Sequence, residues 1–164
     1  MNKKETIERA KELRHEDNLE ESQELLFELL QEYPDDPEVL FEVGGSFDVM
    51  GLEPEAIPYY RQAIDNGLTS EALTECLICL GSSQRLVGDY QDAVDTLEEA
   101  SNEFPQSKGV KAFMALAYYS NGQFEESIRT LLDVLVRTTS DDELRAYSDT
   151  LDYFKDNLDE LWEE

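Results

Sequence analysis

Positively charged residues are scarce in this 164-residue chain, which has 13 lysines and arginines against 39 aspartates and glutamates, for a formal net charge of −26. Nucleic acids and anionic membrane surfaces are bound mainly through lysine and arginine side chains that neutralise phosphate. The charge balance therefore predicts a protein that binds neither nucleic acid nor membrane. It leaves two interpretations of the acidic residues: a solvated surface that keeps the chain soluble, or a docking surface for a basic partner.

Long apolar runs are also missing. No stretch approaches the roughly 18 consecutive apolar residues that mark a transmembrane helix. The first residues, MNKKETIERAKEL, are charged and amphipathic and lack the apolar core of a signal peptide. With two cysteines, the chain does not look like a small secreted domain held together by disulfides. We therefore expect a cytoplasmic protein, and its length suits one domain with a real core, since 40% of its residues are hydrophobic.

Residues that carry chemistry are few. The only histidine, His15, lies between Arg14 and Glu16 at the end of the first expected helix, with no nucleophile motif beside it. Adjacent acidic residues occur between and within helices, but no D-x-D-x-D-G calcium loop and no G-x-x-x-x-G-K-S/T phosphate loop is present. These absences predict a protein that is not an enzyme, with no catalytic residues, no cofactor and no metal site.

The two cysteines form a C-x-x-C pair, Cys76-Leu-Ile-Cys79. A redox pair needs its first cysteine at a helix N-terminus, where the helix dipole lowers the thiol pKa, and Cys76 falls several residues inside an expected helix. A zinc site needs a second pair or histidines, and neither exists in the sequence. We therefore expect both cysteines to serve packing or to line a groove, and to react slowly.

The stretch from Leu77 to Pro105 sets the pattern for the rest of the chain. It reads LICLGSSQRLVGDYQDAVDTLEEASNEFP, with an apolar helical segment, a Gly-Asp turn at Gly88, a second helical segment and a proline stop. The same unit recurs at steps of 34, 37 and 34 residues, beginning at Lys3, Pro37, Thr74 and Lys108. The sequence therefore predicts an all-α array of four helix pairs, as repeats about 3–36, 37–70, 74–107 and 108–141.

Four positions of the repeat agree in all units. Small residues at positions 8 and 20 let the two helices of a pair cross closely, and larger ones at 24 and 27 fill the space between pairs. Position 8 holds Ala10, Gly44, Gly81 and Ala115, and position 20 holds Ser22, Ala56, Ala93 and Ser127. Position 24 holds Leu26, Tyr60, Leu97 and Leu131, and position 27 holds Leu29, Ala63, Ala100 and Val134.

Turn and cap residues predict where the helices begin and end. Three extra residues before the third unit predict a first helix about one turn longer than that of the second unit. In the first two units the expected helices are Lys3 to His15, Leu19 to Tyr33, Pro37 to Met50 and Pro54 to Asn66. In the third unit, one helix runs from Thr69 or Ser70 to Gly88 and a second follows Gly88 and ends at Phe104. In the fourth unit, the helices run from Ser107 to Asn121 and from Phe124 to Arg137.

A last helix is expected from Asp141 to about Leu161, within a capping segment 141–162. Its apolar residues recur at steps of 3 and 4 and form one stripe: Leu144, Tyr147, Leu151, Phe154, Leu158 and Leu161. This stripe predicts a cap over the apolar end of the array, which would give a monomer. A seam between two copies, which would give a homodimer, is the alternative.

The repeat resembles the tetratricopeptide repeat, and from Lys3 to about Glu164 the chain looks like a small stand-alone bacterial tetratricopeptide protein. The segments that suggest this are DVMGLEPEAIPYYRQAIDNGL, LGSSQRLVGDY and the Leu158-Asp159-Glu160 ending. Two departures are Arg9 at position 7, where leucine is usual, and Gln84 at position 11, where an aromatic is usual. The resemblance implies a right-handed helical superhelix that acts as a protein-interaction module, without an established enzymatic role.

The resemblance also implies a concave peptide groove lined by the first helix of each pair. Its predicted residues are Ile7, Lys11, Arg14, Phe41, Gly45, Asp48, Ile78, Ser82, Arg85, Ala112, Phe113, Leu116 and Tyr119. The lysine and asparagines with which relatives hold chaperone C-terminal carboxylates are absent from the matching positions. Part of this set would instead be packed if the final helix filled the groove.

An acidic rim at Glu38, Glu42, Asp48 and Glu75 would favour basic residues beside an apolar partner segment. The leading functional hypothesis is an adaptor that holds a peptide or helix of a partner protein. A holdase for an export or assembly client is the alternative.

Overall fold

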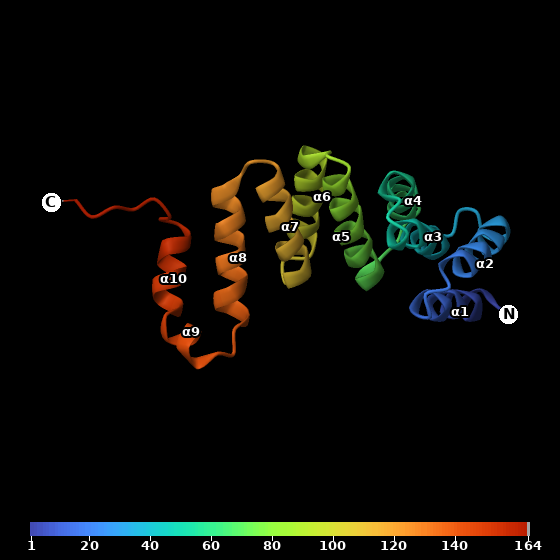
Figure 1. Cartoon of the computed structure of the whole chain (residues 1–164), viewed down its shortest axis with the longest axis horizontal. Helices are drawn as coiled ribbons and strands as arrows, with labels where there is room; N and C mark the ends of the chain where they lie inside the picture. The colour runs from blue at the N-terminus through green and yellow to red at the C-terminus, as the bar shows by residue number, and fades with distance from the viewer. Residues whose placement is uncertain (164) are drawn as a thin grey trace.

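The fold was examined in a computed structural model that describes residues 1–163 and leaves only Glu164 outside (Figure 1). The described residues form helices and loops without strands. The helices are α1 (Lys3–His15), α2 (Leu19–Glu32), α3 (Pro37–Val49), α4 (Glu53–Asp65), α5 (Ser70–Leu86), α6 (Tyr90–Glu103), α7 (Lys108–Ser120), α8 (Phe124–Thr138), α9 (Asp142–Ala146) and α10 (Ser148–Lys155).

The first eight helices pack as four consecutive pairs, and the first helix of each later pair also packs against the second helix of the pair before it. Figure 1 shows the pairs following one another along the long axis of the molecule. The predicted all-α superhelix is confirmed, and the helix bounds agree with the expected ones to within a residue or two through α8. Helix α5 has 17 residues against 13 in α3, so the expected extra turn is present.

Local sequence explains the helix ends. Asn2 forms a capping box with Glu5, and the Asp36 carboxylate accepts hydrogen bonds from the first turn of α3, where Pro37 fits because its missing N–H would be unpaired anyway. Gly88 ends the turn after α5 with a φ of 89°, a conformation that other residues rarely adopt. Thr69 is the N-cap of α5, but its side chain makes no capping hydrogen bond.

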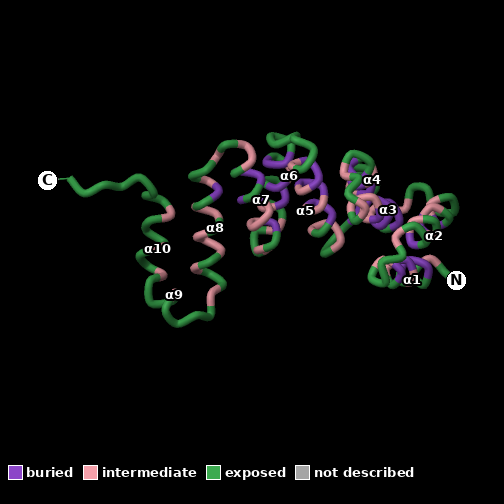
Figure 2. Tube along the Cα trace, in the orientation of Figure 1, coloured by how far each residue is buried: buried purple, intermediate pink, exposed green. Residues whose placement is uncertain are grey.

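Close helix crossings hold each pair together, as the small residues predicted. A methyl group added at Gly81 would lie 2.5 Å from Cγ of Leu97, and one added at Gly44 would lie 2.7 Å from the Tyr60 ring. In the first pair, the Ser22 hydroxyl donates a 2.7 Å hydrogen bond to the Ala10 carbonyl, and in the fourth pair Ser127 does the same to Ala115. The buried residues form several clusters between neighbouring helices, and most of them lie in α1 to α7 (Figure 2).

The expectation of one helix from Asp141 to Leu161 is wrong. The segment is split at Tyr147 into α9 and α10, and the helix ends at Lys155, before Leu158 and Leu161. Short helices depend on tertiary packing for their stability, and residues 156–163 are all exposed. The apolar stripe is therefore interrupted, and only α10 of this segment packs against α8 (Figures 1 and 2). Ile128, Leu131 and Leu135 of α8 remain exposed.

Candidate functional site

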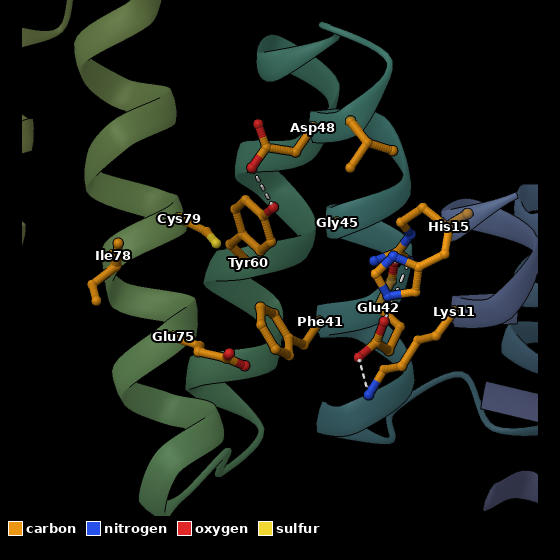
Figure 3. Close-up of a pocket in the computed structure, with 12 residues that line it drawn as sticks. Lys11, His15, Phe41, Glu42, Gly45, Asp48, Tyr60, Glu75, Ile78 and Cys79 are labelled. Carbon is orange, nitrogen blue, oxygen red and sulfur yellow. Dashed lines mark hydrogen bonds and ion pairs between the residues drawn. The ribbon is translucent and has the colours of Figure 1, made fainter. Parts of the chain in front are cut away.

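A cavity of about 470 Å³ opens between α1, α3 and α5 on the side formed by the first helices of the pairs (Figure 3). Its lining combines an apolar floor with charged side chains at the α1 side. The lining residues are Lys11, Arg14, His15, Phe41, Glu42, Gly45, Asp48, Val49, Tyr60, Glu75, Ile78 and Cys79.

An ion-pair network closes the α1 side of the cavity. The Glu42 carboxylate is 3.1 Å from the Lys11 ammonium and 3.3 Å from the Arg14 guanidinium, which also lies 3.4 Å from the Glu42 carbonyl (Figure 3). Glu42 is only 6% exposed, so the two cations neutralise a buried charge that would otherwise be costly. The cations therefore stabilise the contact between α1 and α3.

The acidic rim is smaller than expected from the sequence. Glu42 is neutralised within the fold, and Glu38 is 3.2 Å from the Lys3 ammonium, outside the cavity. Asp48 accepts a 2.8 Å hydrogen bond from the Tyr60 hydroxyl, and burial raises the pKa of the Asp48 carboxyl. Glu75 lies on α5 and is exposed, so it is the carboxylate of this set most available to a partner.

Phe41 of α3 and Ile78 of α5 are apolar lining residues, and Figure 3 shows Phe41 beside Tyr60 and Ile78 on the side of α5 that faces away from both. Both side chains are half-buried. The Phe41 ring centroid is 6.0 Å from that of Tyr60, and Phe41 packs against the core of the second and third pairs. Ile78 packs in turn against the core cluster of Leu77, Ala100 and Val110, so both side chains belong to the core and to the cavity lining at once.

The remaining predicted groove residues lie elsewhere along the array. Ile7 is buried in the core of the first pair, so its assignment to the groove is wrong: α3 covers it. Ser82 and Arg85 on α5 lie outside the cavity, and an Arg85 guanidinium nitrogen is 3.5 Å from the Ser120 hydroxyl. Phe113 packs against the core formed by α6 and α7.

Leu116 and Tyr119 on α7 are both exposed and also lie outside the cavity. The Tyr119 ring centroid is 5.4 Å from that of Phe124, at the start of α8. The structure thus brings six of the predicted groove residues together at the cavity, namely Lys11, Arg14, Phe41, Gly45, Asp48 and Ile78, and leaves Ser82, Arg85, Phe113, Leu116 and Tyr119 outside it.

Some lining residues were not expected in the groove. His15 follows Lys11 by four residues, so the helical period could have placed it on the same face. Tyr60 comes from the second helix of its pair and was assigned to the core, where it is fully buried. Its ring lies against Gly44, where an added methyl group would meet it at 2.7 Å, and it lines the cavity from there.

The thiols of Cys76 and Cys79 are expected to react slowly. Burial raises the pKa of Cys76 to about 12 and that of Cys79 to about 11, so little thiolate is present at pH 8. Alkylation by iodoacetamide at pH 8 should be at least about tenfold slower in the native protein than in urea, with Cys76 the slower of the two. Rapid labelling of both thiols in the native state would contradict this.

The described part of the chain contains no cluster of three or more histidine, cysteine, aspartate or glutamate side chains arranged to hold a metal ion. Within the same residues, no helix has the length and apolar character needed to cross a membrane.

Comparison with known proteins agrees with this architecture. A family profile described as Tetratrico peptide repeat matches residues 37–151. No curated protein sequence matches the chain.

Solved structures share the fold at low sequence identity. MamA 41-end from Desulfovibrio magneticus RS-1 aligns with a TM-score of 0.73 and 17% identity over 94% of this chain and 85% of that one. A tetratricopeptide repeat protein from Parabacteroides merdae ATCC 43184 aligns with a TM-score of 0.73 and 16% identity over 93% of this chain and 58% of that one. A chain of the APC/C hetero-tetramer Cut9-Hcn1 aligns with a TM-score of 0.72 and 17% identity over 89% of this chain and 29% of that one.

Proposed function

Because this chain belongs to the tetratricopeptide repeat family, whose fold generally mediates contacts between proteins, we propose that it is a non-enzymatic adaptor. It holds a peptide or a helix of a partner protein against the concave side formed by α1, α3, α5 and α7. The observation that carries the proposal is the cavity between α1, α3 and α5, which is open to solvent and has Phe41 and Ile78 in its floor.

The cavity supports an apolar anchor on the partner. Its volume of about 470 Å³ suits one or two large side chains rather than a whole folded element. Aromatic and aliphatic side chains buried at the centre of an interface usually supply most of its binding energy. A partner segment would therefore place apolar side chains over Phe41 and Ile78 and lie along the groove toward Tyr119.

Charge supports basic residues beside that anchor. The chain has a net charge of −26, and Glu75 lies exposed at the edge of the cavity. Opposite charges at the rim of an interface raise the association rate more than the final affinity. The proposal includes a cytoplasmic setting, which the unpaired Cys76 and Cys79 favour.

A holdase for one client protein is the second candidate. Apolar side chains exposed on α7 and α8, including Leu116 and Leu131, favour it because a holdase covers apolar surface of its client. A holdase would keep its client from aggregating when the client is diluted from denaturant, whereas an adaptor would bind a folded partner or a short segment of it without that effect.

The groove is tested by replacing Ile78 with glutamate. Capture of protein partners from the source cells, quantified by mass spectrometry, should fall at least tenfold, because a charge would then face the partner's apolar anchor. Glu75→Lys should slow association of a basic partner with little change in folding, since Glu75 is exposed.

Tyr90→Glu is the matched control for Ile78→Glu, because Tyr90 is an exposed apolar residue at the start of α6 and outside the cavity. Circular dichroism establishes that each variant keeps its helices. Unchanged capture by a folded Ile78→Glu protein would contradict the proposal.

A further inference from the structure

The second helices of the third and fourth pairs, α6 and α8, differ in how far they bury the same repeat positions. At position 24, Leu97 of α6 is 1% exposed whereas Leu131 of α8 is 43% exposed. At position 21, Val94 is 1% exposed and Ile128 is 45% exposed. Leu135, at position 28 of α8, is also exposed. The last pair thus leaves uncovered, at positions 21 and 24, the side chains that α6 buries.

The first helix of the following pair covers these positions inside the array. Helix α7 packs against α6, and its Met114, Ala117 and Tyr118 form one core cluster with Val94 and Leu97. After α8 no such helix follows in the described residues, because α9 has five residues and α10 packs elsewhere.

Helix α10 packs against a different face of α8. Asp156, the residue that follows α10, is 3.1 Å from Arg129, and Lys155 of α10 lines a small cavity with Thr130 and Asp133. The sequence of α8 agrees with this placement. Positions 25 and 29 hold Leu132 and Val136 in α8, where α6 has Glu98 and Asn102. Both are half-buried and lie, by the helical period, on the side of α8 that carries Arg129, which indicates that α10 covers this side and leaves the neighbouring face free.

The free face forms what we call the end slot. Its members are exposed apolar side chains of α7 and α8, joined by the contact between the Tyr119 and Phe124 rings. Tyr147, between α9 and α10, and Phe154 of α10 are exposed as well. Figure 2 shows how little of α8 and α10 is buried compared with the preceding pairs. The end slot comprises Leu116, Tyr119, Phe124, Ile128, Leu131 and Leu135.

We propose that the end slot binds an amphipathic, basic helix of a separate protein, which takes the place of the first helix of a fifth pair. The internal slots of this array already hold helices, and the residues of α7 that fill the slot on α6 include Val110, Met114, Ala117 and Tyr118. Their spacing of i, i+4, i+7 and i+8 is the pattern the partner helix presents.

Charge selects the kind of partner. From Asn121 to Glu163 the sequence has twelve acidic and four basic residues. Three of those basic residues, Arg129, Arg137 and Lys155, are already paired with aspartates. A helix with lysine or arginine beside its apolar stripe therefore fits the end slot better than an acidic one.

A second copy of this chain fits poorly. The face of α1 that would enter the slot in a head-to-tail contact carries Glu5, Arg9 and Glu12 in place of apolar residues, and two copies each carry a net charge of −26. The chain's own last residues do not fill the slot either. Leu161 and Trp162 are 83% and 84% exposed, and Figure 1 shows the segment after α10 running away from α8.

A peptide with the sequence of α7 can serve as the probe for binding at the end slot. Helix α7 has two lysines, Lys108 and Lys111, and no acidic residue. A fluorescent peptide with the sequence of residues 108–120, kept helical by a hydrocarbon staple replacing Ala112 and Leu116, presents the four slot-facing residues intact. We expect saturable binding to the full-length protein at low salt, measured by fluorescence anisotropy.

Variants locate the binding. Leu131→Glu in the protein should weaken peptide binding at least tenfold, whereas Tyr90→Glu, at an exposed apolar residue of α6, should leave it unchanged. A peptide with Met114→Glu should lose binding, and one with Lys108→Glu and Lys111→Glu should bind at least tenfold more weakly. Because Leu131 is exposed, the Leu131→Glu protein is expected to keep its helical circular dichroism.

Three results would overturn the proposal. The first is equal peptide binding by the Leu131→Glu and unaltered proteins. The second is a dimer in sedimentation that Leu131→Glu dissociates, which would make a second copy the occupant. The third is at least tenfold tighter peptide binding after Leu161→Glu and Trp162→Glu, which would make the chain's own end the occupant.

Discussion

Replacing Leu97 with alanine is expected to lower the free energy of unfolding by about 3 kcal/mol, whereas the same replacement of Leu131 should cost less than about 1 kcal/mol. The two leucines occupy the same position of the repeat, so sequence pattern alone gives them equal weight. Leu97 is enclosed by α5, α6 and α7, and its removal would leave a cavity beside Gly81. Leu131 has no covering helix and loses few contacts.

Urea denaturation followed by circular dichroism measures this pair of substitutions. The slopes of the two transitions should match that of the unaltered protein if only stability changes. A loss for Leu131→Ala as large as that for Leu97→Ala would mean that the end of the array is covered in solution, and the end slot would not be free.

Gly81→Val is expected to destabilise the protein by about 2–3 kcal/mol, even though valine has a somewhat better helix propensity than glycine. Position 81 lies where α5 crosses α6, and the first added carbon alone would meet three carbons of the Leu97 side chain at 2.5, 2.7 and 3.0 Å. Leu97 is fully enclosed, so it has no free space into which it can move.

Gly45→Ala provides the control in an equivalent backbone setting. Gly45 also lies inside a helix, but an added methyl group would meet only the Arg14 guanidinium, at 3.4 Å. Alanine should therefore leave stability unchanged or raise it by up to about 1 kcal/mol through helix propensity. If Gly81→Val melted like the unaltered protein, the close crossing of α5 and α6 would be refuted.

Most of the fold could be predicted from the sequence because fixed positions of the repeat mark the helix crossings and the helix ends. Gly44 and Gly81 mark where helices cross, and Pro37 and Gly88 mark where they begin and end. The C-terminal segment could not be predicted in the same way. Its apolar stripe has a helical period through Leu161, but a stripe forms a helix only where a neighbour covers it, and the sequence does not say which neighbour that is.

The candidate site could be predicted only in part. Repeat position gave the helix face for Phe41, Asp48 and Ile78, and all three line the cavity. The depth of burial depends on the neighbouring helix, which is why Ile7 turned out to be core and Glu42 to be neutralised by Lys11. The end slot could be recognised only by comparing the burial of α8 with that of α6 in three dimensions.

Site-specific photo-crosslinking tests the proposed adaptor role most directly. A benzophenone side chain placed at Ile78, in the groove, should form a crosslink to the partner in the source cells. The same group at Glu99, an exposed residue of α6 outside the groove, should not. Peptide mapping should identify a partner segment with apolar residues beside lysine or arginine. Crosslinks that form from position 99 as readily as from position 78 would contradict the groove as the binding surface.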